Sequence, residues 1–96
     1  MSIAFSAEAT TWYAGLPEEH REVVNRRLRE LAISPERAPV RGLSPEGRSI
    51  YFALAVIDDG QVWAYRIDFV EDELMRRRGR LPAIAVRRGK RIARRP

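Results

Sequence analysis

The chain has 96 residues, 45% hydrophobic and 32% charged, a composition that suits one folded domain and excludes a disordered chain. It contains no cysteine, which excludes disulfide bonds and thiolate metal sites. Ten of its eighteen Lys and Arg residues lie in 76–95, where there is no Asp or Glu, and the remainder holds all thirteen acids. A cationic end on an acidic body is typical of nucleic-acid-binding proteins, and also of solvated basic tails without a fixed partner.

The amino-terminal segment carries no sign of targeting. Residues 1–5 lack a basic region followed by a long apolar run, so we expect no signal peptide. No stretch approaches the roughly 20 apolar residues that a membrane span needs. These features predict a soluble, cytoplasmic protein with no membrane partner.

The first third of the chain predicts a strand and two helices. Residues 2–5 are suited to a short strand, and Ser6 is a suitable N-cap for a helix over 7–14. Pro17, at the first helical position, begins a second helix over about 17–33. A single apolar stripe on this helix, which we expect to face the core, consists of Val23, Val24, Leu28 and Leu31.

A sheet is predicted to follow. Residues 34–48, with three prolines and two glycines, predict a loop. Residues 50–57 are apolar on both faces, as a central strand is, and a hairpin turn at 58–60 leads into an alternating strand over 62–70.

The end of the chain predicts one more strand and a basic extension. Residues 71–80 are polar and rich in arginine, and 81–86 alternate as a third strand does. Residues 87–96 have little apolar content and predict an arm that extends beyond the sheet.

The alternation of side chains divides the sheet into two predicted faces. We expect the large residues to face the helices: Phe52, Leu54, Val56, Trp63, Tyr65, Ile67, Phe69, Ile84 and Val86. The opposite face would then present Tyr51, Ala53, Ala55, Ala64, Arg66, Asp68, Ala83, Ala85 and Arg87. The small alanine side chains would make this face shallow, so that it could bind a base or a sugar–phosphate chain. It could equally be exposed to solvent or covered by a partner protein.

Five short segments, spread over nearly the whole chain, match one known family. They are residues 12–21 at the junction of the two helices, Leu28-Arg29-Glu30-Leu31 with Ser34-Pro35, Arg41-Gly42-Leu43, Tyr65-Arg66-Ile67, and Val86 with Gly89-Lys90-Arg91. Together they resemble the RelE/ParE toxins of type II toxin–antitoxin systems. The resemblance implies an α+β fold with an N-terminal strand, a two-helix hairpin and a three-stranded antiparallel sheet, forming one sheet packed on the helices. The whole chain would be one domain, 1–96, with a basic C-terminal arm at about 87–96.

The same resemblance implies a function. RelE-like toxins enter the ribosome and cleave mRNA without a metal or cofactor, whereas ParE-like toxins inhibit DNA gyrase, and an antitoxin protein neutralises both. We therefore expect a translation-inhibiting toxin, a metal-independent endoribonuclease, whose partners are an antitoxin, the ribosome and mRNA. The alternatives are a gyrase inhibitor or a non-catalytic nucleic-acid-binding module. A homodimer and a toxin–antitoxin hetero-oligomer both stay open.

Residue by residue, the resemblance places Arg66 and Arg91 at family arginines. We expect Arg66, Arg91 and Tyr51 to form the catalytic group. The residues expected to bind nucleic acid are Arg87, Arg88, Lys90, Arg76, Arg77 and Arg78. The second predicted strand lacks the lysines that RelE-like nucleases carry there, and this favours the non-nuclease alternatives.

A general base for RNA cleavage is harder to find in the sequence. His20 is the only histidine, but its place among the apolar residues of the second helix favours a structural role. Asp68 shares a predicted face with Arg66, two residues away. It is therefore a candidate base, or more simply a carboxylate that holds Arg66 in place.

Overall fold

The structure, a computed structural model, describes residues 2–72, 77–78 and 83–92. Its elements are β1 (Ser2–Phe5), α1 (Ala7–Ala14), α2 (Glu18–Ile33), a 3-10 helix (Pro35–Arg37), β2 (Val40–Leu43), β3 (Ser49–Asp58), β4 (Val62–Glu71) and β5 (Ala83–Ile92). This arrangement confirms the α+β class. Neither described helix is long and apolar enough to cross a membrane.

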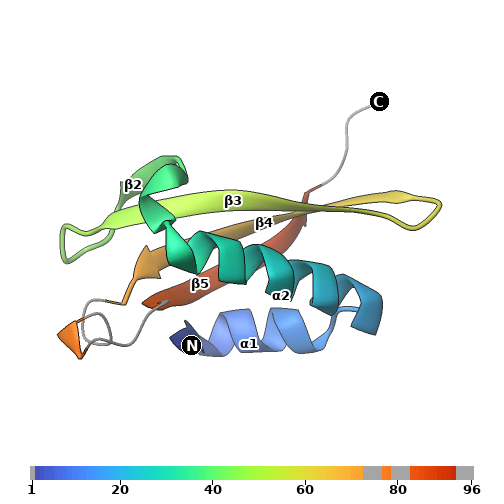
Figure 1. Cartoon of the computed structure of the whole chain (residues 1–96), viewed down its shortest axis with the longest axis horizontal. Coiled ribbons are helices and arrows are strands. Elements are labelled where there is room, and N and C mark those ends of the chain that lie inside the picture. The colour runs from blue at the N-terminus through green and yellow to red at the C-terminus, as the bar shows by residue number, and fades with distance from the viewer. Residues whose placement is uncertain (1, 73–76, 79–82, 93–96) are drawn as a thin grey trace.

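The strands form one mixed sheet of five, in the order β1-β5-β4-β3-β2. The strands β3, β4 and β5 are antiparallel neighbours, β1 runs parallel to β5, and β2 is antiparallel to β3. Both helices contact Tyr65 of β4, α1 through Trp12 and α2 through His20, so they cover the same face of the sheet (Figure 1). We call this the helix face and the other the open face.

The strand β2 lies where the sequence predicted only a loop. Its four residues are all exposed, and its register with β3 is irregular between Val40 and Gly42. A short edge strand without a buried face has no alternating pattern, so its sequence does not distinguish it from a loop. The sheet consequently has one strand more than we predicted.

The strand β5 is longer than predicted. It continues to Ile92, and residues 88–92 pair with β4 instead of forming an arm. Pairing requires backbone hydrogen bonds but not apolar side chains, so the basic composition concealed the strand. The last residues of the predicted arm, 93–96, lie outside the described part of the chain.

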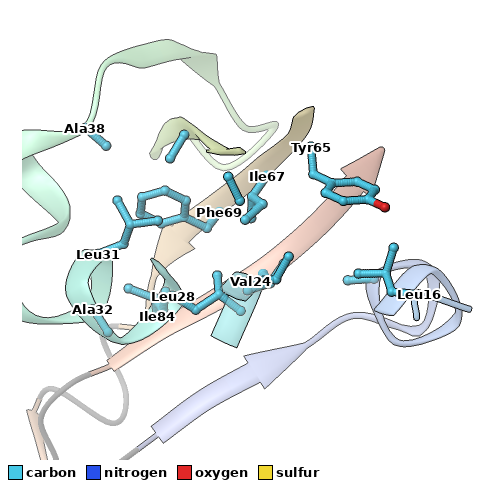
Figure 2. Packing of buried hydrophobic residues seen from close by; sticks show 14 of the residues in the cluster. Leu16, Val24, Leu28, Leu31, Ala32, Ala38, Tyr65, Ile67, Phe69 and Ile84 are labelled. Carbon is cyan, nitrogen blue, oxygen red and sulfur yellow. The ribbon is translucent and has the colours of Figure 1, made fainter. Parts of the chain in front are cut away.

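The helix α2 packs with the stripe that the sequence predicted. Val24, Leu28 and Leu31 are buried and Val23 is half-buried. Figure 2 shows three of these α2 residues against the side chains of β4, Tyr65, Ile67 and Phe69. Pro17 is the N-cap of α2, not its first helical residue, because its ψ of 148° is extended.

The predicted orientation of β3 was wrong. Ala53, Ala55 and Ile57 are buried, whereas Leu54 and Val56 are exposed on the open face. Strand pairing fixes this arrangement, because Ala53 lies opposite Ile67 and Ala55 opposite Tyr65, both buried on the helix face. The large residues of β4 and α2 fill this side of the core, and the small alanines leave room for α2 to pack closely.

The other predicted orientations agree with the structure. Tyr65, Ile67, Phe69, Ile84 and Val86 are all buried. The hairpin turn also forms as predicted, and Gly60 there has a φ of 100°, a conformation that favours glycine. The open face therefore carries Phe52, Leu54 and Val56 from β3 instead of the predicted tyrosine and alanines.

Candidate nucleic-acid interface

Two consecutive arginines of β5 lie on the open face. The pairing of β5 with β4 shifts between Val86, opposite Phe69, and Arg88, opposite Asp68, so Arg87 is an extra residue. Strict alternation would turn one of two neighbouring side chains toward the helices, and a β-bulge removes that alternation. Both arginines accordingly line one cleft together with Asp68. The bulge thus adds a positive charge to the open face.

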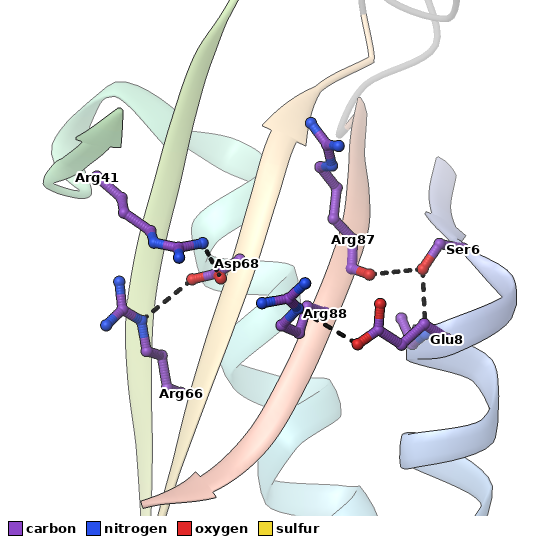
Figure 3. Close-up of polar contacts among 8 residues, drawn as sticks. Ser6, Glu8, Arg41, Arg66, Asp68, Arg87 and Arg88 are labelled. Atoms are coloured by element: carbon purple, nitrogen blue, oxygen red, sulfur yellow. Dashed lines mark hydrogen bonds and ion pairs between the residues drawn. The ribbon is translucent and has the colours of Figure 1, made fainter. Parts of the chain in front are cut away.

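A buried carboxylate organises the centre of this face. The side chain of Asp68 is only 7% exposed, and each of its oxygens accepts a hydrogen bond from a guanidinium (Figure 3). Arg41 Nη1 of β2 lies 2.9 Å from Oδ2, and Arg66 Nε of β4 lies 3.2 Å from Oδ1. Charge-assisted hydrogen bonds of this kind fix the orientation of both cations.

Two further contacts complete the cationic surface. The guanidinium carbon of Arg66 lies 4.6 Å from the ring centroid of Phe52, a cation–π contact. Lys90 pairs with Arg66 across the strands, so its side chain is on the same face. We use the name basic face for Arg41, Arg66, Arg87, Arg88 and Lys90.

The start of α1 borders this face. Arg41, Asp68, Arg87 and Arg88 line a cleft of about 370 Å³ that also contacts the first helical residues. Ser6 caps α1 by accepting a hydrogen bond from Ala9 N at 3.0 Å, and it donates its own hydroxyl proton to the carbonyl of Arg87 at 2.6 Å. One serine therefore anchors both the helix and the bulge. Figure 3 shows the adjacent ion pair, in which Arg88 Nε lies 3.3 Å from Glu8 Oε1.

The structure does not bring the predicted catalytic residues together. Arg66 is on the open face, whereas Arg91 pairs with buried Tyr65 and lies on the helix side. The guanidinium of Arg91 stacks on Trp63, 3.9 Å from the ring centroid. Tyr51 is half-buried on the helix face and stacks on Phe69, with centroids 5.6 Å apart. Neither residue shares a site with Arg66.

The residues predicted to bind nucleic acid are divided by the structure. Arg87, Arg88 and Lys90 belong to the basic face. Arg77 and Arg78 are exposed, and Arg76 lies outside the described residues.

Sequence reasoning did not single out Arg41 as a functional residue. It lies in a segment that the sequence predicted to be a loop, and it contributed only to the family resemblance, as part of Arg41-Gly42-Leu43. It joins the basic face because β2 pairs beside β3, a contact between segments that no local pattern reveals.

His20 lies in a hydrogen-bonded chain on the helix side. It is 1% exposed, with Nδ1 2.8 Å from the hydroxyl of Tyr65 and Nε2 2.9 Å from Oδ2 of Asp59. A carboxylate only accepts, so Nε2–H donates to Asp59, and a neutral ring then accepts the Tyr65 proton at Nδ1. Trp63 Nε1 donates to the other oxygen of Asp59 at 3.0 Å. This chain joins α2 to the β3–β4 hairpin and does not reach the basic face.

Acid should weaken this connection. The hydrogen bond from His20 is the largest of the effects that lower the pKa of Asp59 below its ordinary value. A carboxyl whose folded pKa is depressed stabilises the fold above its unfolded pKa, and that contribution is lost as the pH falls through the folded pKa. We expect the free energy of unfolding to fall below about pH 4 less steeply in Asp59→Asn than in the parent. Urea titrations across this range test it, and parallel pH profiles would contradict it.

The basic face can bind phosphate groups through bidentate and point-charge contacts. The carboxylates that line its cleft, Asp68 and Glu8, both form ion pairs with arginines. Within the described ranges, no group of three or more metal-ligating side chains gathers in one place. The described part of this face is therefore a cationic surface whose two carboxylates are already paired with arginines.

Comparison with known proteins adds no relative. No protein-family model matches the chain, and neither a curated protein nor a solved structure does. The resemblance to RelE/ParE toxins stays a prediction from the sequence.

Proposed function

We propose that this protein binds RNA through the basic face and acts as the toxin of a type II toxin–antitoxin module that inhibits translation. The observation that carries the proposal is the convergence of cations from three strands around one buried carboxylate. Phosphate contacts supply most of the affinity in sequence-independent nucleic-acid binding. The toxin role rests on the resemblance of the five short segments, and the antitoxin and ribosome are its proposed partners.

The arrangement on the basic face suits single-stranded RNA. Arg66 lies over the Phe52 ring, so the guanidinium presents a flat surface on which an unpaired base can stack. Arg41 and Arg88 lie on the β2 and β5 sides of Asp68, where successive phosphates of one strand can reach them. Stacking beside a cationic track is the usual way in which proteins bind single strands without sequence preference.

A second candidate function is binding without cleavage, by a nucleic-acid-binding module of the same fold. Metal-free RNA cleavage needs a base for the 2′-hydroxyl. Both oxygens of Asp68 are occupied by arginines, and His20 is buried on the other side of the sheet. These contacts favour a surface that holds RNA without cutting it.

Binding of a labelled single-stranded RNA over a range of salt concentrations tests the proposal. A plot of log affinity against log salt concentration has a negative slope. For single strands this slope becomes shallower by about 0.7 for each phosphate contact removed. We expect Arg66→Gln and Lys90→Gln each to reduce the slope by about this amount. Arg91→Gln is the matched control. It removes the same charge from the helix face of the same two strands, β4 and β5, and should leave the slope unchanged.

Expression of the same variants in a bacterium tests the toxin role. Growth arrest that Arg66→Gln relieves and Arg91→Gln does not would support it, and mapped mRNA 5′ ends would separate cleavage from simple binding. Arrest without RNA binding would move the target to a protein such as gyrase. RNA affinity that depends on Arg91 but not on Arg66 or Lys90 would contradict the basic face itself.

A further inference from the structure

The exposed large hydrophobic residues gather at one edge of the molecule. In the described part of the chain they all belong to the C-terminal end of α2 and to the neighbouring strands β2 and β3: Ile33 (74% exposed), Val40 (54%), Leu43 (69%), Leu54 (46%) and Val56 (59%). Leu54 and Val56 are exposed two residues apart on the same face of β3, and neighbouring exposed apolar side chains mark an interaction site more often than isolated ones do.

Among the described residues, no strand pairs with most of the outer edge of β3. Its neighbour β2 pairs only with its first residues, and the last backbone bond on that side runs from Phe52 N to Pro39 O at 3.0 Å. Backbone groups of alternate residues point the same way, so Leu54 and Val56 also direct their N–H and C=O groups outward. Among the described residues no strand covers this edge, and Figure 1 shows β3 running on past β2 to the hairpin.

The free edge lacks the usual protection against strand pairing. Soluble proteins guard edge strands with charges, prolines or bulges. Residues 52–57 are Phe-Ala-Leu-Ala-Val-Ile, six apolar residues in succession. The group that does satisfy part of this edge is the guanidinium of Arg27 of α2, whose Nε donates to the carbonyl of Leu54 at 3.2 Å.

The charges beside the edge are arranged so that a second copy is complementary. At one end of the free segment an apolar groove of about 700 Å³ lies against Phe52 and Leu54. Arg27, Arg37 and Glu30 line it, and Arg27 Nη1 lies 3.2 Å from Glu30 Oε2, so this end carries two positive charges and one negative charge. At the other end the strand closes with the acidic pair Asp58 and Asp59. A two-fold axis through the middle of the segment sets the basic end of each copy beside the acidic end of the other.

We propose that two copies of this chain associate by antiparallel pairing of their β3 edges, centred on Ala55. Leu54 of each copy then lies opposite Val56 of the other, and the two open faces continue as one surface. The incoming N–H replaces Arg27 at the Leu54 carbonyl, and the released guanidinium lies near Asp58 of the second copy. Pro39 already occupies the N–H of Phe52, so the pairing between copies is limited to residues 53–57, and the partners of β2, 49–51, lie beyond that segment.

Sedimentation equilibrium of the full chain over a wide concentration range tests the proposal. We expect a reversible monomer–dimer equilibrium, and we expect Val56→Lys to weaken it at least about 100-fold, because each dimer then places two lysines in the apolar seam. Ala14→Lys is the matched control, since it adds the same charge at an exposed position on α1 and should leave the equilibrium unchanged. A monomer at every concentration, or equal weakening by both variants, would overturn the proposal.

Cross-linking tests the register independently of any loss of folding. The chain has no cysteine, so Leu54→Cys and Val56→Cys each introduce a single exposed thiol. An equimolar mixture under mild oxidation should form the mixed 54–56 disulfide faster than either variant forms a disulfide with itself. In the proposed dimer, position 54 of one copy lies opposite position 56 of the other, whereas two identical positions are not opposite each other. Faster pairing of either variant with itself would exclude this register, and equal slow reaction in all three would exclude the interface.

Discussion

Replacing Gly89 with alanine should destabilise the fold by about 3 kcal/mol or more, which is the upper range for overpacking a core. A Cβ atom at Gly89 would overlap three ring carbons of Trp12, far inside van der Waals contact. The indole cannot simply move away, because its ring also packs edge-to-face on Tyr65 at 5.9 Å. The substitution therefore forces α1 away from β5, and urea unfolding measures the cost.

Two comparisons separate this contact from the ordinary effect of removing a glycine. Gly42→Ala, in exposed β2, has nothing within 4 Å of the new Cβ and should change stability by less than about 0.5 kcal/mol. In the background Trp12→Ala, the Gly89→Ala substitution should lose most of its cost, because the clash partner is gone. Additive effects of the two substitutions would show that the close approach of Trp12 and Gly89 is not what requires the glycine.

The fold was predictable where one face of an element is clearly apolar. The α2 stripe and the alternation of β4 each have one buried side, so their orientation follows from the sequence. The strand β3 is apolar on both sides, and its parity alone does not decide which side faces the helices. The pairing of Ala53 with Ile67 decides it, and that is a relation between distant residues.

The candidate site was predictable only in part, for a related reason. The basic residues near the end of the chain were identified, and Arg66 was placed on the open face correctly. The bulge at Arg87 shifts the parity of β5 beyond it, so Arg91 falls on the helix side and Lys90 beside Arg66. An extra residue in a strand has no signature in composition or periodicity. The resemblance grouped Arg66 with Arg91, and the structure separates these two side chains across the sheet.

The replacement of His20 by alanine should cost about 3 kcal/mol of stability and leave the basic face intact. The change opens a cavity between α2 and the sheet and removes the partner of the buried Tyr65 hydroxyl. It also frees Asp59, so the hairpin loses its attachment to α2. Removing one partner of a buried hydrogen bond costs more than removing both, and Tyr65→Phe in the His20→Ala background should therefore restore part of the loss.

The same variant distinguishes a structural histidine from a catalytic one. Because His20 lies across the sheet from Arg66 and Asp68, RNA affinity of the folded His20→Ala protein should equal that of the parent at low temperature. Glu22→Ala, exposed on the same helix, controls for helix substitution and should change stability by less than about 0.5 kcal/mol. RNA binding or cleavage lost in a fully folded His20→Ala protein would place the histidine in the functional site and contradict the separation of the two faces. Retained activity with lowered stability would assign His20 to the framework that holds the hairpin against α2.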